Sequence, residues 1–96
     1  MNLDMKLVDL VNTINSVDEE SIIFQEDRDF FDSNIILSFA EEGDGGIKQK
    51  EGRKYYYLIE VFLAKEFIDD WTASLDYKPA ADEIAKRLYD YAINDA

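Results

Sequence analysis

The hydrophobic pattern changes period near residue 62, and this change constrains the fold more than any other feature of the sequence. From about Lys54 to Val61, apolar side chains alternate between two faces, which is typical of a β-strand. From Phe62 to Leu75, the spacing is that of an amphipathic helix. Its apolar stripe contains Leu63, Phe67, Trp71 and Leu75, and we expect Trp71 to lie in the core. The sequence therefore predicts the α+β class.

Four further elements follow from spacing and turn residues. Apolar residues at helical spacing predict a first helix over Leu3–Ser16. Short runs of β-branched and aromatic residues predict strands over Ser21–Glu26 and Asn34–Ala40. Pro79 suits the first turn of a last helix, where acidic residues are also favoured. The apolar side of this helix comprises Ala81, Ile84, Ala85, Leu88, Tyr91 and Ala92.

The stretch Glu41–Gly46 holds three of the four glycines in the chain. Glycine adopts positive φ without strain, so this stretch predicts a hairpin turn. The expected order is α-β-β-β-α-α, with a three-stranded antiparallel meander. We expect helices to cover mainly one face of this sheet. A length of 96 residues fits a single domain, 1–96.

The charge balance favours a basic partner. There are 22 acidic and 10 basic residues, which gives a formal net charge of −12. Nucleic acid and anionic membranes are disfavoured as direct partners because both are negatively charged. Long-range attraction favours a basic protein. The apolar runs are far shorter than the roughly 20 residues that span a bilayer.

The absence of cysteine and histidine narrows the chemistry. It removes thiolate zinc sites, the usual general base near neutral pH and the commonest transition-metal ligand. The segment Asp27–Asp32 begins like a calcium loop but lacks its glycine and final glutamate. We expect a non-enzyme without a cofactor or metal. The first nine residues lack the apolar region of a signal peptide, so the expected location is the cytoplasm of a bacterial host.

Clustered carboxylates are the candidate partner-binding groups. Asp18, Glu19 and Glu20 form one cluster, and Glu66 joins two aspartates on the outer side of the second predicted helix. Solvated surface charge is the alternative interpretation for any single cluster. Among three adjacent tyrosines, at least one ring must face away from the core, and an exposed tyrosine is a good interface anchor. The predicted partner-binding residues are Glu41, Glu42, Asp44, Asp69, Asp70, Asp27, Asp29 and Tyr56.

A basic stretch, Lys48–Lys54, interrupts the negative charge with four cations and one acid. Lysines beside a very apolar strand discourage aggregation at a sheet edge, and this is the favoured interpretation. A second contact patch, or a clamp on the acids of the chain itself, is the alternative.

A resemblance adds a functional hypothesis. The layout, the opening Met1-Asn2-Leu3, Asp9-Leu10-Val11 in the first helix, and Phe67, Ile68 and Trp71 resemble small phage-encoded anti-CRISPR proteins that inhibit type II nucleases. The resemblance implies DNA mimicry, in which an acidic surface occupies the basic nucleic-acid-binding surface of a nuclease. The alternatives are an immunity protein that neutralises a toxin nuclease and an acidic adaptor.

Overall fold

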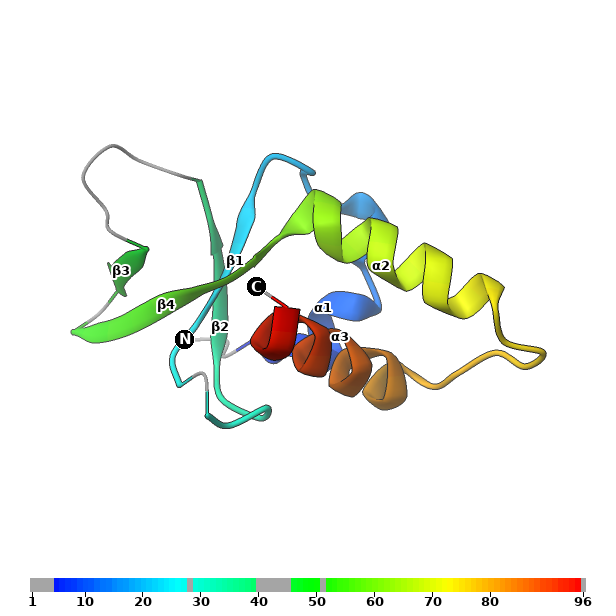
Figure 1. Cartoon of the computed structure of the whole chain (residues 1–96). Helices are drawn as coiled ribbons and strands as arrows, with labels where there is room; N and C mark the ends of the chain where they lie inside the picture. Colours follow the sequence, from blue (N-terminus) through cyan, green and yellow to red (C-terminus); the bar gives the residue numbers. More distant parts are fainter. Residues whose placement is uncertain (1–4, 28, 40–45, 51, 96) are drawn as a thin grey trace.

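A curled antiparallel sheet with three α-helices forms the protein in the computed structural model, which describes residues 5–27, 29–39, 46–50 and 52–95 (Figure 1). The sheet order within the described residues is β2-β1-β4-β3. The strands are β1 (Ile22–Gln25), β2 (Ile35–Ser38), β3 (Ile47–Lys50) and β4 (Arg53–Glu60). The helices are α1 (Leu7–Val11), α2 (Val61–Ala73) and α3 (Ala81–Asp95), with a 3-10 turn, η1 (Ile14–Ser16). The α+β class is confirmed.

The two inner strands are β1 and β4, so the predicted meander is wrong. β1 pairs with β2 on one side and with β4 on the other, and all three strands alternate in direction. The cause lies in the composition of β1, which is buried along its whole length and carries Ile22, Ile23 and Phe24. A strand that is apolar on both faces belongs in the middle of a sheet.

A fourth strand, β3, corrects the prediction of three. It pairs with β4 through the two-residue connection 51–52, and Gly52 has φ 80°. The predicted hairpin stretch Glu41–Gly46 instead connects strands at opposite edges of the sheet. Residues 40–45 lie outside the described residues. Gly46 has φ 81° and accepts a hydrogen bond from the Tyr57 backbone N–H at 2.8 Å.

A β-bulge at Leu58 divides the apolar side chains of β4 between the two faces of the sheet. The register with β1 shifts here, so Leu58 and Ile59 both join the core on the helix side. The predicted alternation of side chains between the two faces of this strand therefore fails at Ile59. Tyr55 and Tyr57 lie in a smaller cluster with Ile22, Phe24 and Ile36, which contains only strand residues.

All three helices lie on one side of the sheet, as predicted (Figure 1). The first is shorter than Leu3–Ser16, because Met5 is extended and forms a β-bridge with Ile35. Leu88 is fully buried in the resulting core, as are Ala85 and Ala92. No helix of the described residues is long and apolar enough to cross a membrane.

Trp71 is only half-buried and lies outside this core, contrary to the prediction. The α2 helix contacts α3 through Phe67, whose ring stacks on Tyr91 at a centroid distance of 4.3 Å. The Trp71 ring lies at the edge of the contact between the two helices, and the Arg87 guanidinium is 5.8 Å from its centroid. Such a cation–π contact needs no burial.

Candidate partner-binding surface

The junction between β4 and α2 positions the first part of the site. The strand ends at Glu60 and the helix begins at Val61, with no loop between them. The Val61 backbone N–H donates to the Ser21 carbonyl at 3.0 Å, which satisfies one of the free N–H groups of the helix start. Val61 is fully buried, so the core anchors the backbone that carries Glu60 and Phe62.

A turn before β1 brings two more carboxylates to this junction. The Asp18 side chain accepts a hydrogen bond from the Glu20 backbone N–H at 2.9 Å. The Lys65 ammonium, from α2, donates to the Val17 carbonyl at 2.9 Å and lies 3.7 Å from the Glu19 carboxylate. These contacts fix the turn beside α2 and leave Glu19 and Glu20 exposed.

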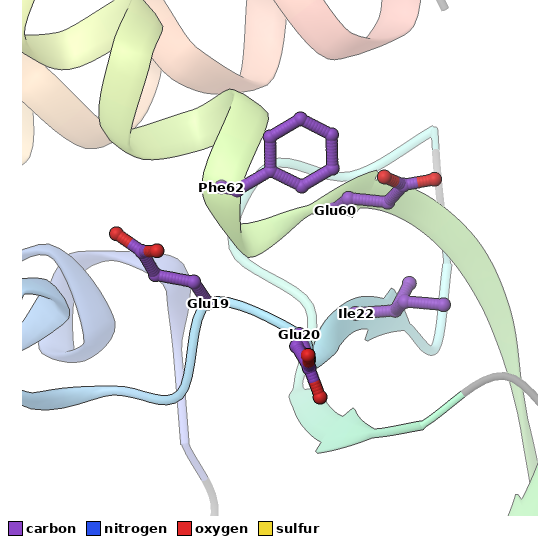
Figure 2. A pocket seen from close by; sticks show the side chains of 5 residues that line it. All are labelled: Glu19, Glu20, Ile22, Glu60 and Phe62. Atoms are coloured by element: carbon purple, nitrogen blue, oxygen red, sulfur yellow. The ribbon is translucent and has the colours of Figure 1, made fainter.

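An apolar hollow with an acidic margin lies between the turn, the strand end and the helix start (Figure 2). Its volume is about 500 Å³. Phe62 and Ile22 supply its apolar wall, and Phe62 is 42% exposed. Figure 2 shows the carboxylates of Glu19, Glu20 and Glu60 at its margin, pointing away from one another. Such a spread suits extended cationic groups better than a single small ion.

The outer side of α2 continues the acidic margin along the molecule. Glu66, Asp69 and Ala73 follow Phe62 at helical spacing, and all four are exposed. Asp70, beside them, is also exposed. A second hollow of about 470 Å³ lies along this side and is lined by Leu63, Glu66, Phe67, Asp70, Trp71 and Tyr91.

We call this surface the acidic face; its members are Glu19, Glu20, Glu60, Phe62, Glu66, Asp69 and Asp70.

Glu60 interacts with the Tyr57 hydroxyl. The pKa of Tyr57 is raised above its ordinary value by burial, then by the negative charge of Glu60 and their hydrogen bond. The Tyr57 hydroxyl therefore donates to the Glu60 carboxylate at the sheet end of the face.

Two of the predicted binding residues, Asp69 and Asp70, lie on the acidic face. Three others, Glu41, Glu42 and Asp44, lie outside the described residues. Asp27 forms a turn between β1 and β2, because its carboxylate accepts the Asp29 backbone N–H at 2.9 Å.

The remaining predicted residues lie toward the other end of the sheet. Gln25 ends β1 opposite Tyr56, whereas Ile22 begins it opposite Glu60. Asp27 and Asp29 follow Gln25, so they lie beyond the Tyr56 end of this ladder. Asp29 is exposed, and Tyr56 is 37% exposed. The structure therefore separates these three residues from the α2 carboxylates.

Sequence reasoning missed Glu60 and Phe62 as members of the site. Phe62 stands one position before the apolar stripe of α2, on its otherwise acidic side. An aromatic residue displaced from the apolar stripe was a usable signal. Glu60 gave a weaker signal, because its place beside Phe62 depends on the strand passing directly into the helix.

The described residues contain no group of three or more Asp and Glu side chains arranged to hold a metal ion. Comparison with protein-family models gives no match, and no curated protein or solved structure matches the chain significantly.

Proposed function

We propose that this chain is an inhibitor that acts in the bacterial cytoplasm by occupying the basic nucleic-acid-binding surface of a nuclease. The observation that carries the proposal is that three neighbouring segments place exposed carboxylates on the surface beside Phe62, whose side chain is 42% exposed. The turn, the strand end and the outer side of α2 each contribute acids to this one surface.

The chemistry of the acidic face suits a surface rich in arginine and lysine. Carboxylates form strong charge-assisted hydrogen bonds with guanidinium and ammonium groups. An aromatic face attracts the same cations, and an apolar hollow accommodates their aliphatic stems. A groove that binds the DNA backbone presents these side chains in quantity.

The way the acids are held also supports this proposal. Three of the six carboxylates of the face lie on α2, and Glu60 ends β4. Glu19 and Glu20 lie on the hydrogen-bonded turn, where Glu19 is paired with Lys65. Groups held on ordered elements lose less side-chain entropy on binding than groups on a flexible tail. The resemblance to anti-CRISPR proteins makes type II CRISPR nucleases the first candidates.

An affinity capture with matched baits tests the proposal. The wild-type chain and the variant E66K/D69K/D70K are immobilised and exposed to lysate of the bacterium that hosts the chain. We expect a nuclease to be retained by the wild type, lost with the variant and released by added DNA. The purified nuclease should then stop cleaving DNA when the wild-type chain is added.

A matched control uses D32K/D76K/D82K, which reverses three exposed acids outside the acidic face. It should retain the nuclease. Failure to retain any nuclease, or retention of a nuclease together with its DNA, contradicts the proposal. Retention of a toxin nuclease instead of a CRISPR nuclease would identify the immunity-protein alternative.

A further inference from the structure

The outer edge of β3 carries backbone groups that point away from the sheet. Hydrogen-bonded and non-hydrogen-bonded pairs alternate along an antiparallel ladder. The Tyr57 N–H donates to the Gly46 carbonyl, so Gly46 and Tyr57 form a hydrogen-bonded pair. Every second residue of β3 follows the same pattern, so the backbones of Lys48 and Lys50 also bond to β4. The N–H and C=O groups of Ile47 and Gln49 therefore face outward. Figure 1 shows β3 at the end of the molecule away from the connection of α2 to α3.

The side chains of this edge differ between the two faces of the sheet. On one face, Ile47 is 41% exposed beside its cross-strand partner Tyr56, which is 37% exposed. On the other face, Lys48 lies over the Phe24 ring at 5.9 Å, and Lys50 is exposed beside its partner Arg53. The edge thus combines outward backbone groups, an apolar pair and a row of cations.

Gatekeeping alone does not account for this combination. Lysines protect an edge strand from pairing with neutral strands or with itself. The exposed apolar pair Ile47 and Tyr56 adds nothing to such protection. A second copy of this chain is disfavoured, because pairing Ile47 of one copy with Gln49 of the other places Lys48 opposite Lys48. Like charges directly opposite each other are destabilising.

We propose that the β3 edge binds an extended acidic peptide segment of a partner protein by strand addition. The backbone of the segment bonds to Ile47 and Gln49, as in other complexes formed by β-augmentation. Its acidic side chains alternate, so that they lie opposite Lys48 and Lys50, where opposite charges are favourable. An apolar side chain of the segment packs on Ile47. This site is independent of the acidic face and of the proposed inhibition.

The test uses a short fluorescein-labelled peptide in which glutamates alternate with valines, titrated with the intact protein and followed by fluorescence anisotropy. The decisive variant is Gln49→Pro. Proline lacks the N–H that faces outward at this position, and an edge strand tolerates it there because no bond to β4 is lost. We expect saturable binding to the wild type and a loss of at least about tenfold in affinity with Gln49→Pro. Lys50→Glu should cause a similar loss.

A second measurement keeps the wild-type protein and changes the peptide. N-methylation of the valine amides, which lie opposite Ile47 and Gln49, leaves every charge in place and blocks strand pairing. We expect this peptide to bind at least about tenfold more weakly. Equal binding of both peptides would mean attraction by charge alone and would overturn strand addition, as would an absence of binding to the wild type. Sedimentation that shows a wild-type dimer dissolved by Gln49→Pro would assign the edge to a second copy instead.

Discussion

Replacement of Gly52 by alanine tests the hairpin that the sequence did not reveal. Gly52 has φ 80°, and a Cβ added there meets no atom within 4 Å. The cost is therefore conformational. The left-handed region destabilises an L-residue by about 1–2 kcal/mol in the folded state. Alanine also lowers the conformational entropy of the unfolded chain, which offsets roughly 0.4–1 kcal/mol of this loss. We expect a net loss of about 1 kcal/mol in the free energy of unfolding, or about 4–8 °C in Tm.

Urea unfolding followed by fluorescence of Trp71, the single tryptophan, measures this loss. For a slope of about 1–3 kcal/mol per M, the midpoint should fall by roughly 0.3–1 M. Gly52→Asn should lose less, because asparagine tolerates the left-handed region. D-alanine at position 52, introduced by chemical synthesis, should lose nothing. An L-alanine variant as stable as the wild type, or a D-alanine variant that is equally destabilised, would refute the assigned turn.

Four other substitutions have defined outcomes. Leu88→Ala, at a fully buried position, should cost about 2–5 kcal/mol in thermal or urea unfolding, whereas Phe30→Ala, at a position 66% exposed, should stay within about 0.5 kcal/mol. Lys65→Met should cost about 1–3 kcal/mol in the same assay, because it leaves the carbonyl of Val17 without its donor; a neutral result would mean that this bond is not formed. The pKa of Tyr57 is raised on folding, so its contribution to stability is complete below the unfolded pKa of 10.0 and is lost as pH rises through the folded value. Tyr57→Phe should therefore flatten the fall in stability above pH 10, and an unchanged alkaline profile would contradict the raised pKa of Tyr57, which comes from burial first and from Glu60 second.

The helices and the inner strands could be predicted because their signals are local. The stripe from Leu63 to Leu75 predicts α2 whatever it packs against, and Ile22-Ile23-Phe24 predicts a buried strand. The same triplet contained the signal for a central position, since it is apolar on both faces. The meander was nevertheless predicted because Glu41–Gly46 is rich in glycine, and composition does not show which strands a loop connects.

The strand β3 and the acidic face depend on pairing and packing beyond the local sequence. Ile47–Lys50 has one strongly apolar residue and becomes a strand because β4 offers it a partner. Asp69 and Asp70 were predicted from helical spacing alone. Their connection to Glu20 and Glu60 arises where α2 follows β4 without a loop and Lys65 holds the turn beside it. These are contacts between segments more than 30 residues apart.

The salt dependence of nuclease binding tests the acidic face most directly. The affinity of the captured nuclease for the wild-type chain, for E66Q/D69N/D70N and for the control D32N/D76N/D82N is measured by calorimetry over a range of salt concentrations. Salt screens attraction between charges, so removing charges that make contact should reduce both the affinity and its dependence on salt. We predict a lower affinity and a shallower salt slope for E66Q/D69N/D70N, with the control close to the wild type. Identical slopes for the two triple variants would contradict the assignment of the acidic face as the binding surface.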